Sequence, residues 1–257
     1  MNGVLGMADL LENTPLTSQQ STYVETLRRC GQTLMNILND ILDFSKVEAG
    51  HMTLEQIEID LLALLDDLVI LHRDQVNRRG LSLYVWIAAD VPSRVTADPT
   101  RLQQVLSNLL NNAIKFTDSG NILIRLDRLD APDMPAPQLK FQVIDDGIGI
   151  PKDRIESVFE EFVRIHPIEG KEGSGLGLAI CLRLTEAMDG RISVTSDGAK
   201  GTTFDVDLPA VDGAHEALDV DKGRVLEDDG GVAAGIFLER TLKFINILSQ
   251  HVSLSHI

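Results

Sequence analysis

Three asparagines stand within five positions of one another, at Asn108, Asn111 and Asn112, and Lys115 follows them. Asparagine forms helices poorly, so its clustering in a segment with helical periodicity indicates a candidate site. Asn108, Asn112 and Lys115 are spaced i, i+4 and i+7 and therefore share one helix face. Amide oxygens suit a Mg²⁺ ion that bridges phosphates, and a lysine adds a point charge for phosphate. Taken alone, a solvated polar face explains the pattern at least as well.

A second candidate segment follows a predicted strand and consists of Asp145-Asp146-Gly147-Ile148-Gly149-Ile150. Leu139, Phe141 and Val143 alternate in that strand, and the same period places Asp145 on the buried face. A buried carboxylate is costly without a donor, and an adenine amino group is one candidate. The glycines permit tight turns and let a base approach the backbone. By itself, the segment is at least as compatible with a plain turn.

A third segment opens a predicted helix and consists of Gly173-Ser174-Gly175-Leu176-Gly177-Leu178. Free backbone amides at a helix start, among small residues, suit phosphates. No Gly-Lys-Ser/Thr follows, so the segment is not a P-loop, and the lack of a directly preceding strand excludes the dinucleotide fingerprint. Considered alone, a simple loop-to-helix junction explains it equally well.

Two further motifs complete an ordered set. Phe159-Glu160-Glu161-Phe162 lies between the second and third segments, and Gly201-Thr202-Thr203-Phe204 follows them. Together with Asn108 to Thr117, Asp145 to Ile150 and Gly173 to Ile180, they resemble the ATPase domain of bacterial sensor histidine kinases. The resemblance covers about residues 1–210, and five motifs in register argue against a chance match.

The resemblance implies a site for ATP and Mg²⁺. Asn108 and Asn112 would hold the metal and, with Lys115, the phosphates. Asp145 would accept the adenine amino group, and Phe116 would flank the base. The other nucleotide contacts that the resemblance implies are Gly147, Gly149, Gly173, Gly175, Leu176, Gly177 and Thr202.

Residues from about 164 to 172 resemble the mobile lid that closes on ATP in this family. Within it, Lys171 is a candidate for the terminal phosphate. His166 fits a solvated loop residue better than a catalyst.

The resemblance departs from the family at the N-terminus. The family's phosphoacceptor lies in His-Glu-x-x-Arg-Thr-Pro, and residues 1–7 resemble the segment that follows that motif. The acceptor histidine would therefore lie six positions before Met1, so no catalytic residue is assigned. None of the six histidines has a matching context; they are His51, His72, His166, His215, His251 and His256. Since phosphoryl transfer needs its nucleophile in line, we expect ATP binding without self-phosphorylation, from a truncated product or a misassigned start.

The N-terminal part predicts a helix hairpin. Residues 2–13 and a segment from 17 or 18 to about 47 have helical periodicity, and the short connection at Asn13-Thr14-Pro15 makes the two helices antiparallel. The seam positions of the longer helix are Val24, Leu27, Gly31, Leu34, Leu38 and Ile41. A hairpin cannot bury such a seam alone, so a second copy would complete a four-helix bundle. Packing of the seam on the chain's own second domain is the alternative.

After Ala49-Gly50, strands and helices mix. Strands are expected near 52–59 and at 81–87, 122–126, 139–144, 191–195 and 203–208, and helices at 61–79, 98–116, 155–163 and 176–187. Asp98-Pro99 gives one helix a capping carboxylate and an N1 proline. We therefore expect an α+β chain with an antiparallel helix hairpin followed by an α/β sandwich ATPase domain of the histidine-kinase/Hsp90-like type. The expected domains are a hairpin lacking the histidine (1–48), an ATP-binding domain (49–211), and an acidic linker and tail (212–257).

The tail offers a second resemblance. Residues 223–229 and 238–242 resemble the start of a receiver domain, in which Asp228 and Asp229 would be the acidic metal-binding pair. A fifth of such a domain cannot fold alone, and an unrelated tail fits equally well. A helix is expected from Phe237 to Leu248. The hint points to a hybrid kinase truncated at both ends.

Composition bounds these hypotheses. The chain of 257 residues is 44% hydrophobic and 24% charged, as in a soluble globular protein. Its net charge of -16 makes nucleic acid a poor partner, and solubility alone is the simplest explanation of this acidity. Two distant cysteines, Cys30 and Cys181, form no disulfide framework or zinc site and fit a reducing cytosol. No run approaches the roughly 18 apolar residues of a membrane span, so we expect a cytoplasmic chain whose longer parent could be anchored upstream.

Three functions compete. The first is the ATP-binding core of a two-component histidine kinase, which transfers phosphate from ATP to histidine and acts as a homodimer with a response regulator or receiver domain. The second is a related mechanical ATPase, against which the helix hairpin argues. The third is a non-catalytic nucleotide-binding dimerisation module, which the missing histidine favours.

Overall fold

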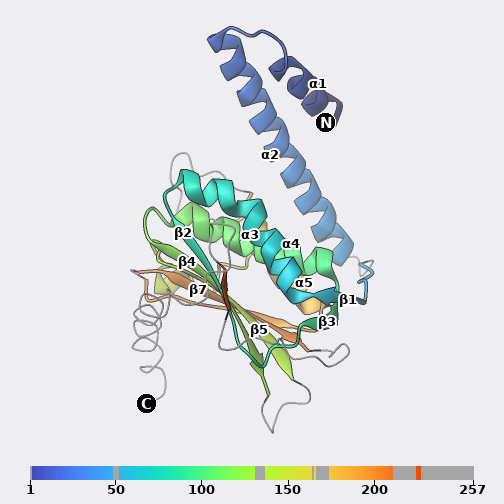
Figure 1. Ribbon diagram of the computed structural model, residues 1–257, viewed down its shortest axis with the longest axis vertical. Helices are drawn as coiled ribbons and strands as arrows, with labels where there is room; N and C mark the ends of the chain where they lie inside the picture. Colours follow the sequence, from blue (N-terminus) through green and yellow to red (C-terminus); the bar gives the residue numbers. More distant parts are fainter. Residues whose placement is uncertain are drawn as a thin grey trace.

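A long helix hairpin stands at the N-terminus (Figure 1). The computed structural model describes residues 2–48, 52–130, 137–163, 165, 174–198, 200–210 and 224–226. Helix α1 spans Asn2–Glu12 and α2 spans Ser18–Glu48. The Gln20 backbone N–H donates to the Thr17 hydroxyl, and the Thr17 N–H donates to the Gln20 side chain, which together form a capping box. The predicted hairpin is confirmed.

The apolar seam of α2 is largely exposed in the single chain. Val24 is buried, but Leu27, Leu34, Leu38 and Ile41 are between 42% and 57% exposed. Helix α2 contacts α5 (Gly177–Ala187), yet that contact leaves these four side chains open. The alternative in which the seam packs on the chain's own second domain is therefore wrong for these residues.

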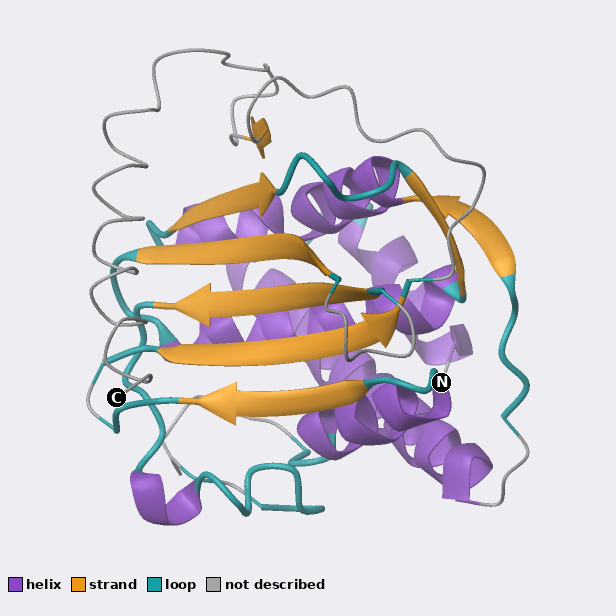
Figure 2. Cartoon of the chain, turned by 90° about the horizontal axis from the view of Figure 1, so that it is seen from below, coloured by secondary structure: helices purple, strands orange, loops and turns teal. Residues whose placement is uncertain are grey.

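The second part of the chain is an α/β sandwich, which confirms the predicted fold class. Six of the described strands form one sheet in the order β6-β7-β5-β4-β2-β8. Their bounds are β2 Ser82–Ile87, β4 Asn121–Leu129, β5 Gln138–Asp145, β6 Arg191–Thr195, β7 Thr202–Pro209 and β8 Arg224–Leu226. β2 and β4 pair in parallel, and the other neighbouring strands pair antiparallel, including the consecutive strands β4 and β5. The helices lie on one face of this sheet (Figure 2).

Two helices besides α5 cover that face. Helix α3 spans Leu61–Arg78 and α4 spans Pro99–Phe116, and the carboxylates of Asp60 and Asp98 cap their first turns. Gly80 ends the α3 region with a φ of +65°, which glycine adopts without strain. Both predicted helices are thus confirmed to within a residue or two.

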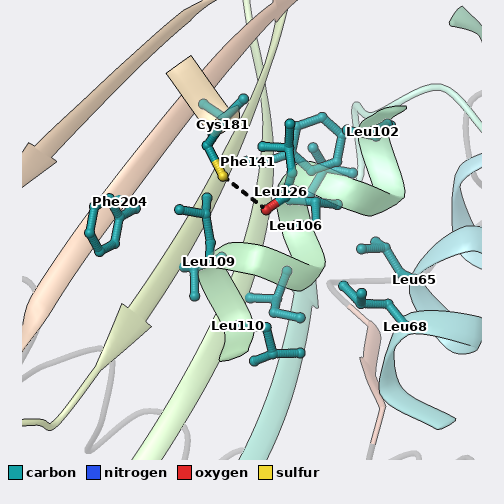
Figure 3. Close-up of a cluster of buried hydrophobic side chains, with 14 of the residues drawn as sticks. Leu65, Leu68, Leu102, Leu106, Leu109, Leu110, Leu126, Phe141, Cys181 and Phe204 are labelled. Carbon is teal, nitrogen blue, oxygen red and sulfur yellow. Dashed lines mark hydrogen bonds between the residues drawn. The ribbon is translucent and has the colours of Figure 1, made fainter. Parts of the chain in front are cut away.

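The hydrophobic core lies between the sheet and these helices, with α4 at its centre (Figure 3). Leu102, Leu106, Leu109 and Leu110 are each at most 1% exposed. They pack with side chains of α3, α5 and the strands, among them Leu65, Leu68, Leu126, Phe141 and Phe204. Each fully buried leucine stabilises the fold by roughly 2 kcal/mol, so α4 is firmly fixed. Cys181 is buried here, and its Sγ lies 3.7 Å from the Val105 carbonyl oxygen.

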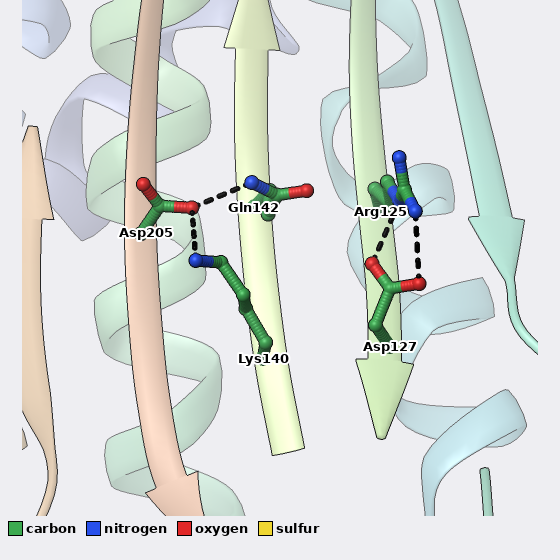
Figure 4. Close-up of polar contacts among 5 residues, drawn as sticks. All are labelled: Arg125, Asp127, Lys140, Gln142 and Asp205. Carbon is green, nitrogen blue, oxygen red and sulfur yellow. Dashed lines mark hydrogen bonds and ion pairs between the residues drawn. The ribbon is translucent and has the colours of Figure 1, made fainter. Parts of the chain in front are cut away.

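The opposite sheet face is polar (Figure 4). Arg125, Gln142 and Asp205 are paired across neighbouring strands, on the side that alternates with the core residues. Arg125 pairs with Asp127 at 2.7 Å, and Asp205 lies 3.1 Å from the Lys140 ammonium. These ion pairs offset part of the cost of burying charge on this face.

Two elements expected from the sequence differ from those in the structure. The helix predicted at 155–163 is wrong: a short 3₁₀ helix, Lys152–Arg154, is followed by turns. Phe162 has a φ of +60° and donates its N–H to the Gly175 carbonyl, which draws the chain out of any helix. The strand expected from Met52 begins only in β1 (Ile57–Asp60), because the Glu55 N–H donates to Asp98.

One strand was not expected from the sequence, and one expected helix cannot be compared with the structure. Strand β3 (Arg94–Ala97) pairs with β1 and was not predicted. The expected helix at 237–248, together with Asp228 and Asp229, lies outside the described residues. No helix in the described part of the chain is long and apolar enough to cross a membrane.

Candidate functional site

Helix α4 carries the first set of predicted site residues on its free side. The opposite side of the helix is fully buried in the core, so the polar side cannot rotate inward. Asn108, Asn112 and Lys115 are accordingly only partly exposed. The Asn108 Nδ2 atom is shielded from solvent and, among the described residues, has no hydrogen-bond partner. An unpaired buried amide is costly, which makes Asn108 a candidate binding group.

The Lys115 side chain keeps close to the end of α4. Its ammonium lies 4.9 Å from the centroid of the Phe116 ring, a cation–π distance. A cation and an aromatic ring thus stand together one turn beyond Asn112. This is the combination that a phosphate and a flanking base would need.

Asp145 ends β5 with a buried carboxylate, 6% exposed, as the strand period predicts. The Gly147 N–H donates to its Oδ1 at 2.8 Å. Burial raises the pKa of Asp145 from 3.8 to about 6, while hydrogen bonds from the Gly147 and Thr202 backbone lower it and the charge of Asp146 raises it. A carboxylate held at such a cost is a candidate binding group.

The neighbouring Asp146 has a different role. It is exposed, and its Oδ2 accepts from both the backbone N–H and the side-chain amide of Asn121, at 2.8 and 3.0 Å. Asp146 therefore fastens the loop to β4, which leaves Asp145 as the candidate for ligand binding.

The glycine loop after β5 lies against the end of α4. A Cβ on Gly147 would lie 2.5 Å from the Asp145 Oδ1 and 2.7 Å from the Phe116 carbonyl oxygen, so only glycine fits. The Ile148 N–H donates to the same carbonyl at 3.2 Å. The second segment is thereby joined to the first. Gly149, with a φ of +73°, continues the turn.

The last motif supports this loop from the other side. The Gly201 N–H donates to the Gly147 carbonyl at 2.7 Å. Thr202, which is buried, stands directly opposite Asp145 in the β5–β7 pairing. Phe204 packs edge-to-face on Phe159, with ring centroids 6.4 Å apart. The motifs at 159–162 and 201–204 thus pack against each other beside the candidate site.

The start of α5 lies beside Asn108. A Cβ on Gly177 would lie 4.0 Å from the Asn108 Cγ. The N-cap residue of α5 is Leu176, whose buried apolar side chain makes no cap, so it leaves the first-turn amides to other acceptors. Gly175 has a φ of +75°, and a Cβ there would lie 2.9 Å from backbone atoms of Phe162. The third segment is therefore also joined to α4.

Most of the predicted site residues thus meet around the C-terminal half of α4. Gly173, Lys171 and His166, and most of the lid at 164–172, lie outside the described residues. Sequence reasoning missed Arg79, whose guanidinium donates to backbone carbonyls at the end of α4. A basic residue at a helix end before glycine gives no sequence signal beyond an ordinary helix terminus.

Comparison with known proteins adds a family context. The family model for "Histidine kinase-, DNA gyrase B-, and HSP90-like ATPase" matches residues 97–212, and the model for "His Kinase A (phospho-acceptor) domain" matches residues 1–50. The chain is 37% identical over 211 residues to the hybrid signal transduction histidine kinase B of Dictyostelium discoideum, which covers 81% of this chain and 11% of that protein.

Two further relatives show the same relation. The aerobic respiration control sensor protein ArcB of Escherichia coli (strain K12) is 37% identical over 222 residues, or 85% of this chain and 28% of that protein. The crystal structure of full-length ShkA in complex with AMPPNP has a TM-score of 0.70 and 35% identity, and covers 83% of this chain and 44% of that one. The chain thus spans less than a third of the length of the two curated relatives, histidine kinase B and ArcB.

Proposed function

The chain belongs to the sensor histidine kinase family and contains its ATP-binding core, and we propose that the C-terminal half of α4 is the centre of its nucleotide site. The observation that carries the proposal is the meeting of three segments that are far apart in sequence. Gly147 closes on the Phe116 carbonyl, and Gly177 lies beside Asn108. A purine nucleotide placed along α4 would have amides and a lysine at one end and a carboxylate at the other.

At the phosphate end, Asn108 and Asn112 would hold Mg²⁺, and Lys115 would bind the phosphates. The buried, unpaired amide of Asn108 fits this role, because turning the amide over exchanges its nitrogen for an oxygen at the same place. The ion, when bound, offsets the phosphate charge. Backbone amides at the start of α5, between Gly175 and Gly177, would add donors to phosphate oxygens.

At the adenine end, Asp145 would accept a hydrogen bond from the exocyclic amino group. Its carboxylate is fixed by the Gly147 N–H, so it keeps one orientation without rearranging. The Phe116 ring would flank the base, and Gly149 and Thr202 would complete the pocket wall. Burial of the carboxylate strengthens any hydrogen bond it makes, because the local dielectric is low.

The domain division that we propose follows the same elements. Residues 1–48 form the dimerisation hairpin, 49–211 the ATP-binding domain, and 212–257 an acidic linker and tail. The start of a receiver domain and an unrelated tail are the two alternatives for this tail, whose β8 pairs with β2. The phospho-acceptor family model ends at residue 50, which supports the first boundary, and the pairing of β2 with β4 supports assigning β2 to the ATP-binding domain, ahead of the part matched by the ATPase model. The open seam of α2 supports a homodimer built as a four-helix bundle. A cytoplasmic location and a receiver or response regulator as phosphate acceptor complete the proposal.

The proposed reaction transfers the γ-phosphoryl group of ATP to a histidine ring nitrogen, with cleavage of the bond to the bridging oxygen and release of ADP. The test combines this chain, Mg²⁺ and γ-labelled ATP with a separate polypeptide that carries a His-Glu-x-x-Arg-Thr-Pro helix. Acid-labile label is expected on that polypeptide. Asn112→Ala should reduce labelling by at least about ten-fold, because it removes a ligand for the phosphates and metal. Asn111→Ala, which alters the exposed neighbour, is the matched control.

The outcomes separate the competing functions. Labelling that survives Asn112→Ala unchanged would refute the metal assignment. ATP binding without label on the histidine polypeptide would favour a non-catalytic module. Release of inorganic phosphate without phosphohistidine would favour a mechanical ATPase.

A further inference from the structure

The last turn of α4 carries the proposed phosphate-binding lysine, and the backbone carbonyl groups at this helix end need hydrogen-bond donors from outside the helix. The last four carbonyl groups of an α-helix lack the usual donors within the helix. Two of them are paired by nearby backbone. The Thr117 N–H donates to the Ala113 carbonyl at 3.0 Å, and the Ile148 N–H donates to the Phe116 carbonyl at 3.2 Å. The carbonyls of Ile114 and Lys115, which lie between these two, need a hydrogen-bond donor from elsewhere.

Arg79 supplies both remaining donors. Its Nη1 lies 3.0 Å from the carbonyl oxygen of Ile114 and 3.2 Å from that of Lys115. The guanidinium charge also stands at the negative end of the helix dipole, where a cation is favourable. With Arg79 in place, each of the last four carbonyls of α4 has a donor.

The turn after α3 fixes the point from which Arg79 reaches α4. The Arg79 N–H donates to the Val76 carbonyl at 3.1 Å, and the Gly80 N–H donates to the Asn77 carbonyl at 3.0 Å. Leu81, the next residue, is buried and also donates to Val76. The backbone is therefore held on both sides of Arg79, and its side chain starts from a fixed place.

We propose that Arg79 is a positioning residue for the phosphate end of the nucleotide site, acting through the last turn of α4 and through Lys115. The inference rests on the proposed function of that site. Arg79 holds the Lys115 backbone directly. It also occupies acceptors for which the Lys115 ammonium can compete, because a lysine in a last turn can cap the carbonyls of its own helix. The ammonium lies over the Phe116 ring, in the same turn as those carbonyls.

A purely structural role for Arg79 makes a different prediction. A residue that only stabilises the fold changes the folded fraction, and it then weakens every ligand of the site by the same factor. A positioning residue for the phosphate end changes the ratio between a ligand with phosphates and one without. The ratio of Mg-ATP to adenosine affinity therefore separates the two roles, since both ligands bind the same folded fraction.

The experiment titrates Mg-ATP and adenosine, at fixed Mg²⁺, into the wild-type chain, Arg79→Met, Arg79→Lys and Arg78→Met. The last variant is the matched control, because Arg78 is exposed in the same helix end and pairs only loosely with Asp74, at 3.9 Å. Calorimetry gives both dissociation constants, and thermal unfolding is followed alongside.

Arg79→Met is expected to weaken Mg-ATP binding about ten-fold and adenosine binding by less than about two-fold. Arg79→Lys keeps the charge but not the planar fork, so it should weaken Mg-ATP by about three-fold. Arg78→Met should match the wild type. A wild-type affinity ratio in the two Arg79 variants, or in Arg79→Lys if Arg79→Met does not fold, would overturn the inference. Absence of Mg-ATP binding in the wild type would instead overturn the proposed function, and the inference with it.

Discussion

At the scale of the residue, the two adjacent carboxylates after β5 show how environment divides roles. Asp146 is exposed and fastens the loop through Asn121. Asp145 is buried, and burial raises its pKa to about 6 against the opposing effect of the Gly147 and Thr202 hydrogen bonds. Asp145 therefore changes charge just below neutral pH, in the place where the adenine is proposed to bind.

Nucleotide affinity should depend on pH through Asp145. The carboxylate accepts a hydrogen bond from the adenine amino group when it is ionised, so Mg-ATP should bind about ten-fold more weakly one pH unit below the pKa of about 6. Asp145→Asn keeps an acceptor oxygen but cannot titrate. Titrations between pH 5 and 8 should show a smaller slope for the variant, and the difference between slopes removes the titration of the phosphates themselves. Equal slopes would mean that Asp145 does not contact the base.

The same shift has an opposite consequence for stability. The folded-state pKa is raised, so between pH 4 and 6 the folded state holds more protons than the unfolded state. Stability from this group therefore falls as pH rises through that window. At pH 7.5, Asp145→Asn removes the burial cost of the charge, and the free energy of unfolding should rise by on the order of 2 kcal/mol while adenine binding weakens. Urea unfolding at pH 4 and pH 7.5 measures both ends of this window.

At the scale of the element, α4 is held at both ends by side chains from other segments. Arg79 closes its C-terminus. At its N-terminus, Asp98 is 4% exposed and uses both carboxylate oxygens: Oδ1 accepts from the Arg101 N–H and Oδ2 from the Glu55 N–H, each at 3.0 Å. The segment that follows the helix hairpin is thus tied to the helix that carries the proposed site.

Asp98→Ala should therefore cost more than the loss of a helix cap. We expect a loss of about 2 kcal/mol in the free energy of unfolding, about 1 from the cap and about 1 from the partly buried hydrogen bond to Glu55. Asp60→Ala is the matched control, because Asp60 is exposed and caps α3 through the Ala63 N–H, and it should cost about 1 kcal/mol. Equilibrium urea unfolding measures both. Equal losses would show that the bond to Glu55 contributes nothing.

The elements also show where sequence reasoning succeeds and where it stops. Helix α4 was predicted within a residue because a proline, a capping carboxylate and an apolar stripe all agree at Asp98 and beyond. The face that we propose as the site was singled out because asparagines contradict helix propensity there. Segment 155–163 was predicted wrongly because its apolar period matches a helix, while a long-range bond between Phe162 and Gly175 decides the backbone. Arg79 could not be found, since its partners are backbone carbonyls, which every residue has.

At the scale of the whole molecule, many of the exposed large apolar side chains in the described part of the chain lie on the N-terminal hairpin. The ATP-binding part buries most of its large apolar side chains between sheet and helices, whereas α1 and α2 expose many of theirs, among them Met7, Leu10, Leu34 and Leu38. Exposed apolar side chains gathered on two neighbouring helices favour an interaction site. A second copy of the hairpin presents the same surface, so two-fold symmetry makes it self-complementary.

Leu34→Glu should convert a dimer into a monomer without unfolding the ATP-binding domain. The substitution places a charge in the seam, where dimerisation would bury it, but the side chain is 45% exposed in the single chain and lies away from α4. Leu71→Glu is the control: Leu71 is more exposed, at 64%, yet it stands on α3 outside the seam, and its replacement should leave the dimer intact. Sedimentation velocity measures the assembly, and Mg-ATP titration checks that the site survives in both variants. A wild-type chain that sediments as a monomer at all concentrations, or a Leu34→Glu chain that remains dimeric, would show that the apolar surface of α2 has another partner.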